Sequence, residues 1–333
     1  VDQGGEWYTC HALFRDLLQQ QLTATLPPDE LAALHRRACD WLNRFGYVDG
    51  ALRHALAAGD QQLAVQIAID HAVEWLEGDR WRTIERRLNL FPAAMIEQHP
   101  WLLMVKGYIL QLQFKWDALL PLLTRAEQQL AAGVGELTPR QTQLLRGYLD
   151  VLWAVHWSAK TDAAKSTAAA RRALQLLPEK SHYTRGVLQL ALTLSLQASG
   201  EAAMAEQMLA AALVQAELSA ASDVAVLRPL LCLLSLSFAE GNLQSAVQMA
   251  HILLHRATAT GSLLSQLLAH LALGAAAYEM NDLPRAAEHI EQGARLRHGS
   301  HARGGHECLV GLALTCHAQG RREAVKATLA RLN

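Results

Sequence analysis

The sequence repeats one pattern of two amphipathic helices about every forty residues, and this periodicity constrains the fold more than any other feature. A small or apolar residue near the start of the second helix marks five successive repeats: Leu119, Ser166, Ala205, Ala246 and Ala286. The intervals between these positions are 47, 39, 41 and 40 residues, and a partial sixth repeat follows at 319–324. Because each hairpin buries its apolar faces only by stacking on its neighbours, the sequence predicts an all-α, right-handed superhelix, or α-solenoid.

Each repeat is typical of a tetratricopeptide-like helical hairpin, and the clearest example spans residues 267–298. Small residues at Gly274, Ala286 and Gly293 would let the two helices, and the next hairpin, approach closely. The pair Asn281–Asp282 predicts the turn between the helices. The repeat is longer than the usual length of about 34 residues, so a HEAT-like hairpin stays open as an alternative.

Composition and charge argue against several classes of partner. The 333 residues carry 30 Lys and Arg against 31 Asp and Glu, and a net charge of −1 favours neither a nucleic-acid backbone nor an acidic membrane surface. No apolar run reaches the roughly 20 residues that span a bilayer, and no secretory signal is visible at the N-terminus. The 5 cysteines lie mostly within helical patterns, which favours buried thiols and a reducing, cytoplasmic location.

The N-terminal part of the chain differs from the regular repeats. All 8 tryptophans precede residue 158, so an aromatic-rich half is joined to a half rich in Ala and Leu. Apolar residues at helical spacing, interrupted by Gly and Pro, predict a row of helices before the first hairpin. These expected helices span residues 8–22, 31–45, 48–58, 61–77 and 80–90.

Three segments of this half carry a resemblance to a known family. In chain order they are residues 7–22, 30–60 and 89–110. Their motif residues are His11, Leu13 and Phe14, followed by Asp49, Ala51, His54, Ala55, Leu56, Ala58, Gly59 and Asp60. With these residues the chain resembles the maltose-regulator (MalT-like) family of large, ATP-dependent, LuxR-type bacterial transcription activators. The likeness is strong to about residue 130 and more generic beyond it.

The resemblance implies a domain organisation. Residues 1–26 would be the end of a winged-helix domain, 27–95 a helical linker subdomain, and 96–333 a tetratricopeptide-like sensor domain. In the family, such a sensor binds a small-molecule inducer and helps to release an ATPase for oligomerisation. The expected partners are therefore an inducer, the other domains of the same activator and, as a further candidate, a regulatory protein.

Two elements of such an activator are not found in the sequence. It contains no Gly-x-x-x-x-Gly-Lys-Ser/Thr loop for ATP phosphates, and no recognition-helix segment follows residues 327–333. We therefore expect no cofactor in this fragment, with ATP bound by a missing upstream domain, and no direct contact with nucleic acid or membrane.

A cluster of metal-binding side chain types lies near the C-terminus, and it comprises His298, His301, His306, Cys308, Cys316 and His317. Imidazole and thiolate are preferred zinc ligands. Because their spacing matches no standard zinc finger, we expect solvated histidines in a loop and no metal site. The sequence also lacks a nucleophile elbow, a His-Glu-x-x-His motif and a Ser-x-x-Lys motif, so we expect no catalytic residues and no enzyme activity.

The inner surface of the predicted superhelix is the expected binding site. In such repeats the first helix of each hairpin lines the concave side, and positions three or four apart share one face. The residues on this line that offer hydrogen-bonding or stacking groups to a small ligand are Trp101, Tyr108, Gln111, Tyr148, Gln197, Arg228, Ser235, Phe238 and Tyr278. The alternative for any one of them, Trp101 and Phe238 above all, is that it fills the core between hairpins.

Two functions fit this pattern. The first is the effector-sensing region of a transcription activator, with a small inducer in the concave groove. The second is a protein–protein interaction scaffold whose groove binds a peptide or a partner protein. An enclosed pocket would favour the first function, and an open, elongated groove would favour the second. Sugar, acyl compound, alcohol and peptide all stay open as the inducer.

Overall fold

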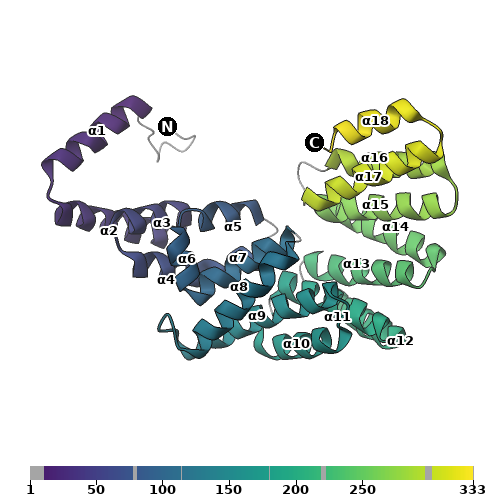
Figure 1. Ribbon diagram of the computed structural model, residues 1–333, viewed down its shortest axis with the longest axis horizontal. Coiled ribbons are helices and arrows are strands. Elements are labelled where there is room, and N and C mark those ends of the chain that lie inside the picture. The colour runs from purple at the N-terminus through teal and green to yellow at the C-terminus, as the bar shows by residue number, and fades with distance from the viewer. Residues whose placement is uncertain are drawn as a thin grey trace.

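A curved row of helices makes up the whole of the described chain. The computed structural model describes residues 11–77, 81–113, 115–179, 181–218, 223–296 and 302–332. Over these residues the chain forms eighteen α-helices and no strand, which confirms the all-α prediction. The helices follow an arc from α1 at one end to α18 at the other, and these two helices lie on the same side of the arc (Figure 1).

Six helices precede the hairpins: α1 (Ala12–Thr25), α2 (Pro28–Arg44), α3 (Val48–Ala57), α4 (Gln61–Glu77), α5 (Trp81–Leu88) and α6 (Ala93–Gln98). The first five match the expected segments to within a few residues, whereas the sequence predicts no helix for the short α6. Helix α2 begins at Pro28, as the run Pro27–Pro28–Asp29–Glu30 in the sequence indicates. Proline suits the first helical turn, and Asp29 and Glu30 there favour the positive end of the helix dipole.

Six helical hairpins follow. They pair α7 (Pro100–Leu112) with α8 (Trp116–Ala131), α9 (Pro139–Ala159) with α10 (Ala163–Leu176), α11 (His182–Ala198) with α12 (Ala202–Leu218), α13 (Asp223–Ala239) with α14 (Leu243–Thr260), α15 (Leu263–Glu279) with α16 (Leu283–Arg295), and α17 (Ala302–Ala318) with α18 (Arg322–Ala330). The array begins near the predicted boundary at residue 96, and the domain boundaries themselves stay predictions.

The turn inside a hairpin has one recurring geometry. Residues with positive φ occur at Thr161, Gly200, Gly241, Asn281 and Gly320, at intervals of 39, 41, 40 and 39 residues. In the turn at Asn281, the N–H of Asp282 donates to the carbonyl of Ala277 at 2.8 Å, which ends the first helix in a Schellman-type motif. The Asp282 side chain then accepts the Arg285 N–H at 3.3 Å and caps the second helix.

Small side chains set the spacing between the helices. All five residues that define the repeat lie on second helices, and each of them is completely buried, with 0% of its surface exposed. The first helices contact one another in the series α7, α9, α11, α13, α15 and α17, while each second helix packs against the first helix of its own hairpin and of the next. The first helices therefore form the inner layer, as predicted.

The helices before the hairpins divide into two parts. Helices α2 to α6 share one continuous hydrophobic core with the first three hairpins. Helix α1 buries no residue, and its predicted apolar stripe lies in the open, with Leu13 exposed by 75% and Phe14 by 54%. Its assignment to the end of a winged-helix domain stays a prediction.

The structure explains most of the motif between residues 49 and 60. Ala51 and Ala55 are completely buried on α3. Gly59 has φ of +71°, which ends that helix in the left-handed region. The Asp60 side chain accepts the Leu63 N–H at 3.0 Å and caps α4. The motif is therefore a helix, its left-handed end and the cap of the next helix.

The cysteines agree with the prediction of buried thiols. Four cysteines, Cys39, Cys232, Cys308 and Cys316, are buried thiols, and Cys10 lies outside the described residues. Burial raises the pKa of the Cys308 thiol to about 12. Within the described part of the chain, no helix combines the length and hydrophobicity of a membrane span.

Two glycines on first helices test how tightly the hairpins close. A Cβ at Gly274 would overlap Ile290 Cγ1 and lie 3.2 Å from the Ala286 carbonyl oxygen, whereas one at Gly107 would meet only leucine methyl groups, at 3.1 Å or more. We expect Gly274→Ala to lower the free energy of unfolding by about 1–3 kcal/mol. The added methyl would meet the buried side chain of Ile290 and the backbone carbonyl of Ala286, and neither can move aside easily.

Gly107→Ala is the matched control, measured in the same denaturant titration. Its gain in helix propensity, about 1 kcal/mol, should offset the small shift of the leucine side chains. Equal destabilisation by the two substitutions would contradict the close approach at Gly274.

Candidate binding site on the inner face

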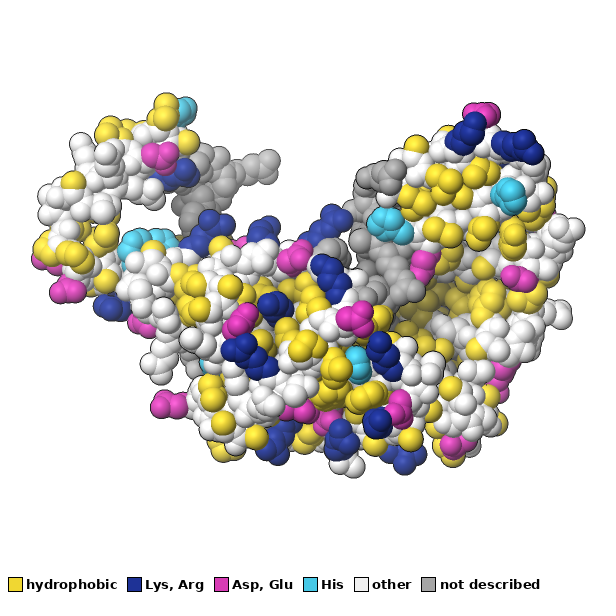
Figure 2. Space-filling view, viewed as in Figure 1, with side chains coloured by type: hydrophobic (Ala, Val, Ile, Leu, Met, Phe, Trp, Pro, Cys, Tyr) yellow, Lys and Arg dark blue, Asp and Glu magenta, His cyan; other side chains and the backbone are white. Residues whose placement is uncertain are grey.

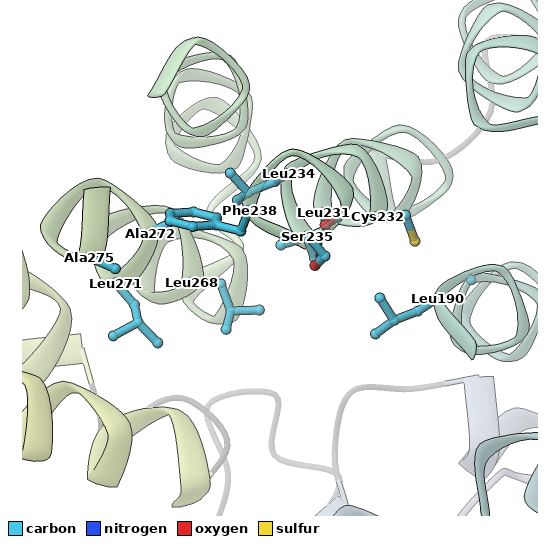
Figure 3. Close-up of a pocket in the computed structure, with 11 residues that line it drawn as sticks. Leu190, Leu231, Cys232, Leu234, Ser235, Phe238, Leu268, Leu271, Ala272 and Ala275 are labelled. Atoms are coloured by element: carbon cyan, nitrogen blue, oxygen red, sulfur yellow. Dashed lines mark hydrogen bonds between the residues drawn. The ribbon is translucent and has the colours of Figure 1, made fainter. Parts of the chain in front are cut away.

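A hollow lies on the inner face where the first helices of three hairpins meet. Its volume is about 350 Å³, within the usual range of small-molecule pockets. The lining residues are Gly186 and Leu190 from α11, Leu231, Cys232, Leu234, Ser235 and Phe238 from α13, and Leu268, Leu271, Ala272 and Ala275 from α15 (Figure 3). On a larger scale, Figure 2 shows the molecule hollowed between the N-terminal helices and the C-terminal hairpins, with Lys and Arg as well as hydrophobic side chains around the recess.

The lining of this hollow is almost entirely apolar. The described residues that line it include no charged side chain and no amide. Its one hydroxyl, on Ser235, donates to the Leu231 carbonyl at 2.9 Å within α13, so this group is already hydrogen-bonded inside the helix. The site is therefore equipped to contact apolar surface rather than to exchange hydrogen bonds.

Two of the nine predicted site residues, Ser235 and Phe238, line this hollow. Gln197 and Tyr278 occupy the same repeat position as Phe238, three residues before the left-handed turn residue, and are half-buried outside the lining. The side chain of Arg228 lies outside the described part of the structure.

The other four predicted residues are in the core. Trp101, Tyr108, Gln111 and Tyr148 are between 1% and 9% exposed. The rings of Trp101 and Tyr148 have centroids 6.4 Å apart, and the Tyr108 hydroxyl donates to the Leu76 carbonyl at 3.2 Å. These side chains pack α4, α7 and α9 together. They are therefore core residues in this structure, which is the alternative that the sequence left open.

The reason for this burial is that the end of α4 packs against the inner face of the first hairpins. Glu77, the last residue of α4, reaches the first turn of α11. Its carboxylate accepts the backbone N–H of Tyr183 at 2.8 Å and the hydroxyl of Thr184 at 2.6 Å. An acid is unfavourable at the C-terminal end of its own helix, but here it satisfies N–H groups at the positive end of another helix.

Burial raises the pKa of the Glu77 carboxyl, and the hydrogen bonds from Thr184 and Tyr183 oppose that shift. The contact joins the N-terminal subdomain to the helix that lines the hollow, since Thr184 and Gly186 are two residues apart on α11. Glu77 is not among the residues that the sequence predicts for the site, although an acid at the C-terminal end of a helix indicates a partner outside that helix. The leucines of the hollow are not among them either, because in sequence an apolar residue on an inner helix is indistinguishable from a core residue.

The group of histidines and cysteines near the C-terminus lies only partly within the described residues. Cys308 and Cys316 are buried in the packing of the last hairpins. A Cβ at Gly293 would lie 2.8 Å from the Cys308 sulfur, so this thiol fills the space beside a glycine. His298 and His301 lie outside the described residues. Among the residues that are described, no three His, Cys, Asp or Glu side chains are grouped as metal ligands would be.

Glu77→Gln tests the contact between α4 and α11 through its pH dependence. With a pKa raised above the ordinary 4.5, the folded state binds a proton more readily than the unfolded chain. The stability contributed by this carboxyl therefore grows as the pH falls and is lost as the pH rises through the raised pKa. We expect the free energy of unfolding of the variant, minus that of the wild type, to become more negative from about pH 7 to about pH 5.

Urea titrations at the two pH values measure this difference. Glu206→Gln on α12 is the reference for the removal of an exposed carboxylate. A difference for Glu77→Gln that is the same at both pH values would contradict the buried contact.

Solved structures share this fold at low sequence identity. The crystal structure of the apo form of RapI aligns with a TM-score of 0.52 at 11% identity and covers 91% of this chain and 86% of RapI. The crystal structure of a Rap protein complexed with competence and sporulation factor aligns with a TM-score of 0.55 at 11% identity, over 92% of this chain and 97% of that protein. Both support the helical-repeat architecture.

Sequence relatives are transcriptional regulators. The HTH-type transcriptional regulator MalT of Serratia proteamaculans is 31% identical over 188 residues, and MalT of Klebsiella pneumoniae is 27% identical over 185 residues. Each alignment covers 56% of this chain but only 20% of the relative, so the chain matches about a fifth of their length. The model of the MalT-like TPR region matches residues 147–333, which is more than half of the chain. The chain belongs to the MalT-like TPR region family.

Proposed function

We propose that this chain is the effector-sensing region of a MalT-like transcription regulator and that a small molecule binds in the hollow between α11, α13 and α15. The observation that carries the proposal is the hollow itself. It has the volume of a ligand pocket and lies on the inner layer of a repeat array. Its walls come from three separate hairpins, so a bound molecule would favour one relative arrangement of those hairpins over others.

The same helix provides a route from the hollow to the N-terminal part of the chain. Helix α11 contributes Gly186 and Leu190 to the hollow and receives the Glu77 carboxylate at its first turn. A shift of α11 on ligand binding would therefore change the contact with α4. In this proposal, the N-terminal helices pass the change to ATPase and DNA-binding domains elsewhere in the regulator. The region itself is cytoplasmic and performs no catalysis.

A protein-interaction scaffold is the second candidate function. One of the proteins with the same fold was solved as a complex with competence and sporulation factor. The uncovered apolar stripe of α1 also favours a protein contact, since Leu13 and Phe14 are exposed by 75% and 54%. This surface lies on α1 rather than at the hollow, so the two functions are compatible and separable by mutation.

Thermal denaturation of the chain against a metabolite library of sugars, acyl compounds, alcohols and peptides tests the sensor proposal. A compound that binds the folded state adds about 2.7 kcal/mol to the free energy of unfolding when its concentration is a hundred times its Kd. Phe238→Ala removes an aromatic ring from the lining, and we expect it to abolish this gain.

The matched control is Phe14→Ala, which removes an exposed ring on α1 and should leave the gain intact. The comparison uses the ligand-dependent gain and not the ligand-free melting temperature, because Phe238 also packs against the core around α13 and α14. A gain that survives in Phe238→Ala would place the ligand elsewhere and contradict the assignment of the hollow.

A further inference from the structure

The chemistry of the hollow restricts the class of molecule that it can hold. Leu190, Leu231, Leu268 and Leu271 contribute branched alkyl groups, and Phe238 contributes a ring (Figure 3). The side chains of Ala272 and Ala275 are small, and with Gly186 they leave the space open. This lining offers a large apolar contact area and few directional interactions.

A sugar is a poor match for such a lining. Each hydroxyl of a buried sugar needs a hydrogen-bond partner to replace the water that it loses, and an unmet hydroxyl weakens binding by about tenfold or more. The described lining offers the Ser235 hydroxyl and the weakly polar Cys232 thiol. The Ser235 hydroxyl already donates to the Leu231 carbonyl, so it keeps only acceptor lone pairs for a ligand. A carboxylate or phosphate would fare no better, because no cationic side chain is among the described lining residues.

We infer that the effector of this site is an uncharged small molecule with mainly alkyl or aryl surface, and the inference rests on the proposed sensor function. The volume of about 350 Å³ limits its size. An α-helix is about 10 Å across, so a partner helix would fit only a side chain into this space.

A series of straight-chain alcohols tests the apolar class directly. Isothermal titration of the whole chain with 1-butanol, 1-hexanol and 1-octanol should show an affinity that rises about fourfold for each added methylene, which corresponds to about 0.8 kcal/mol per buried CH₂. Octanoate has the same length as 1-octanol but carries a charge, and maltose presents hydroxyls instead of an alkyl chain. We expect both to bind at least tenfold more weakly than 1-octanol.

Ala275→Phe tests whether the alcohols bind in the hollow. The larger side chain should fill the space and weaken 1-octanol binding by more than tenfold, whereas Ala210→Phe, at an exposed position of α12, should leave it unchanged. Ser235→Ala removes the single hydroxyl of the lining and should change the affinity for 1-octanol by less than about twofold, because that hydroxyl is used inside α13. If Ala275→Phe does not fold, Phe238→Ala takes its place as the variant that changes the lining.

The outcomes separate this inference from the proposed function. If octanoate or maltose binds more tightly than 1-octanol, and Ala275→Phe abolishes that binding, the hollow is a sensor site but the apolar class is wrong. If Ser235→Ala abolishes the binding of 1-octanol, the hydroxyl contributes to binding and the apolar class is also wrong. If none of these compounds responds to Ala275→Phe, the assignment of the hollow as a ligand site fails, and the class inference fails with it.

Discussion

The close approach of the two helices in each hairpin determines the rest of this structure. It requires a completely buried small or apolar residue near the start of the second helix, and at Gly274 a position where even a Cβ would overlap its neighbour. A left-handed turn residue then reverses the chain in a fixed geometry. Because these two features recur about every forty residues, the first helices align in one inner layer. The hollow is a consequence of that alignment.

The contact at Glu77 gives the array a direction. An isolated solenoid responds to a ligand through its nearest neighbours, and nothing in the repeats alone selects one end. Here a carboxylate at the end of α4 holds the first turn of α11, whose next two turns line the hollow. The N-terminal helices also share a core with the first three hairpins. A change in the hollow would therefore reach the N-terminal side of the chain through α11.

The fold could be predicted from local patterns, and the site only in part. The five repeat positions are completely buried, and all but Leu119 carry small side chains, because a position that keeps helices close favours compact residues. The turn residues carry a further repeat signal, in which Gly200, Gly241 and Gly320 recur with Asn281 about every forty residues. The sequence predicts Trp101 and Tyr148 on the concave face because the register of the repeats gives no information on where α4 packs. Glu77 meets Tyr183 across 106 residues of sequence, a contact that periodicity does not encode.

The central claim is that the inner faces of α11, α13 and α15 bind the effector and that α11 communicates this to α4. Backbone hydrogen exchange of the whole chain, with and without saturating 1-octanol, measures it at each helix. The account predicts slower exchange in α11, α13 and α15, altered exchange at the Tyr183 and Thr184 amides, and unchanged exchange in α18. Protection that is confined to other helices, or that leaves α11 unchanged while α13 and α15 respond, would contradict it.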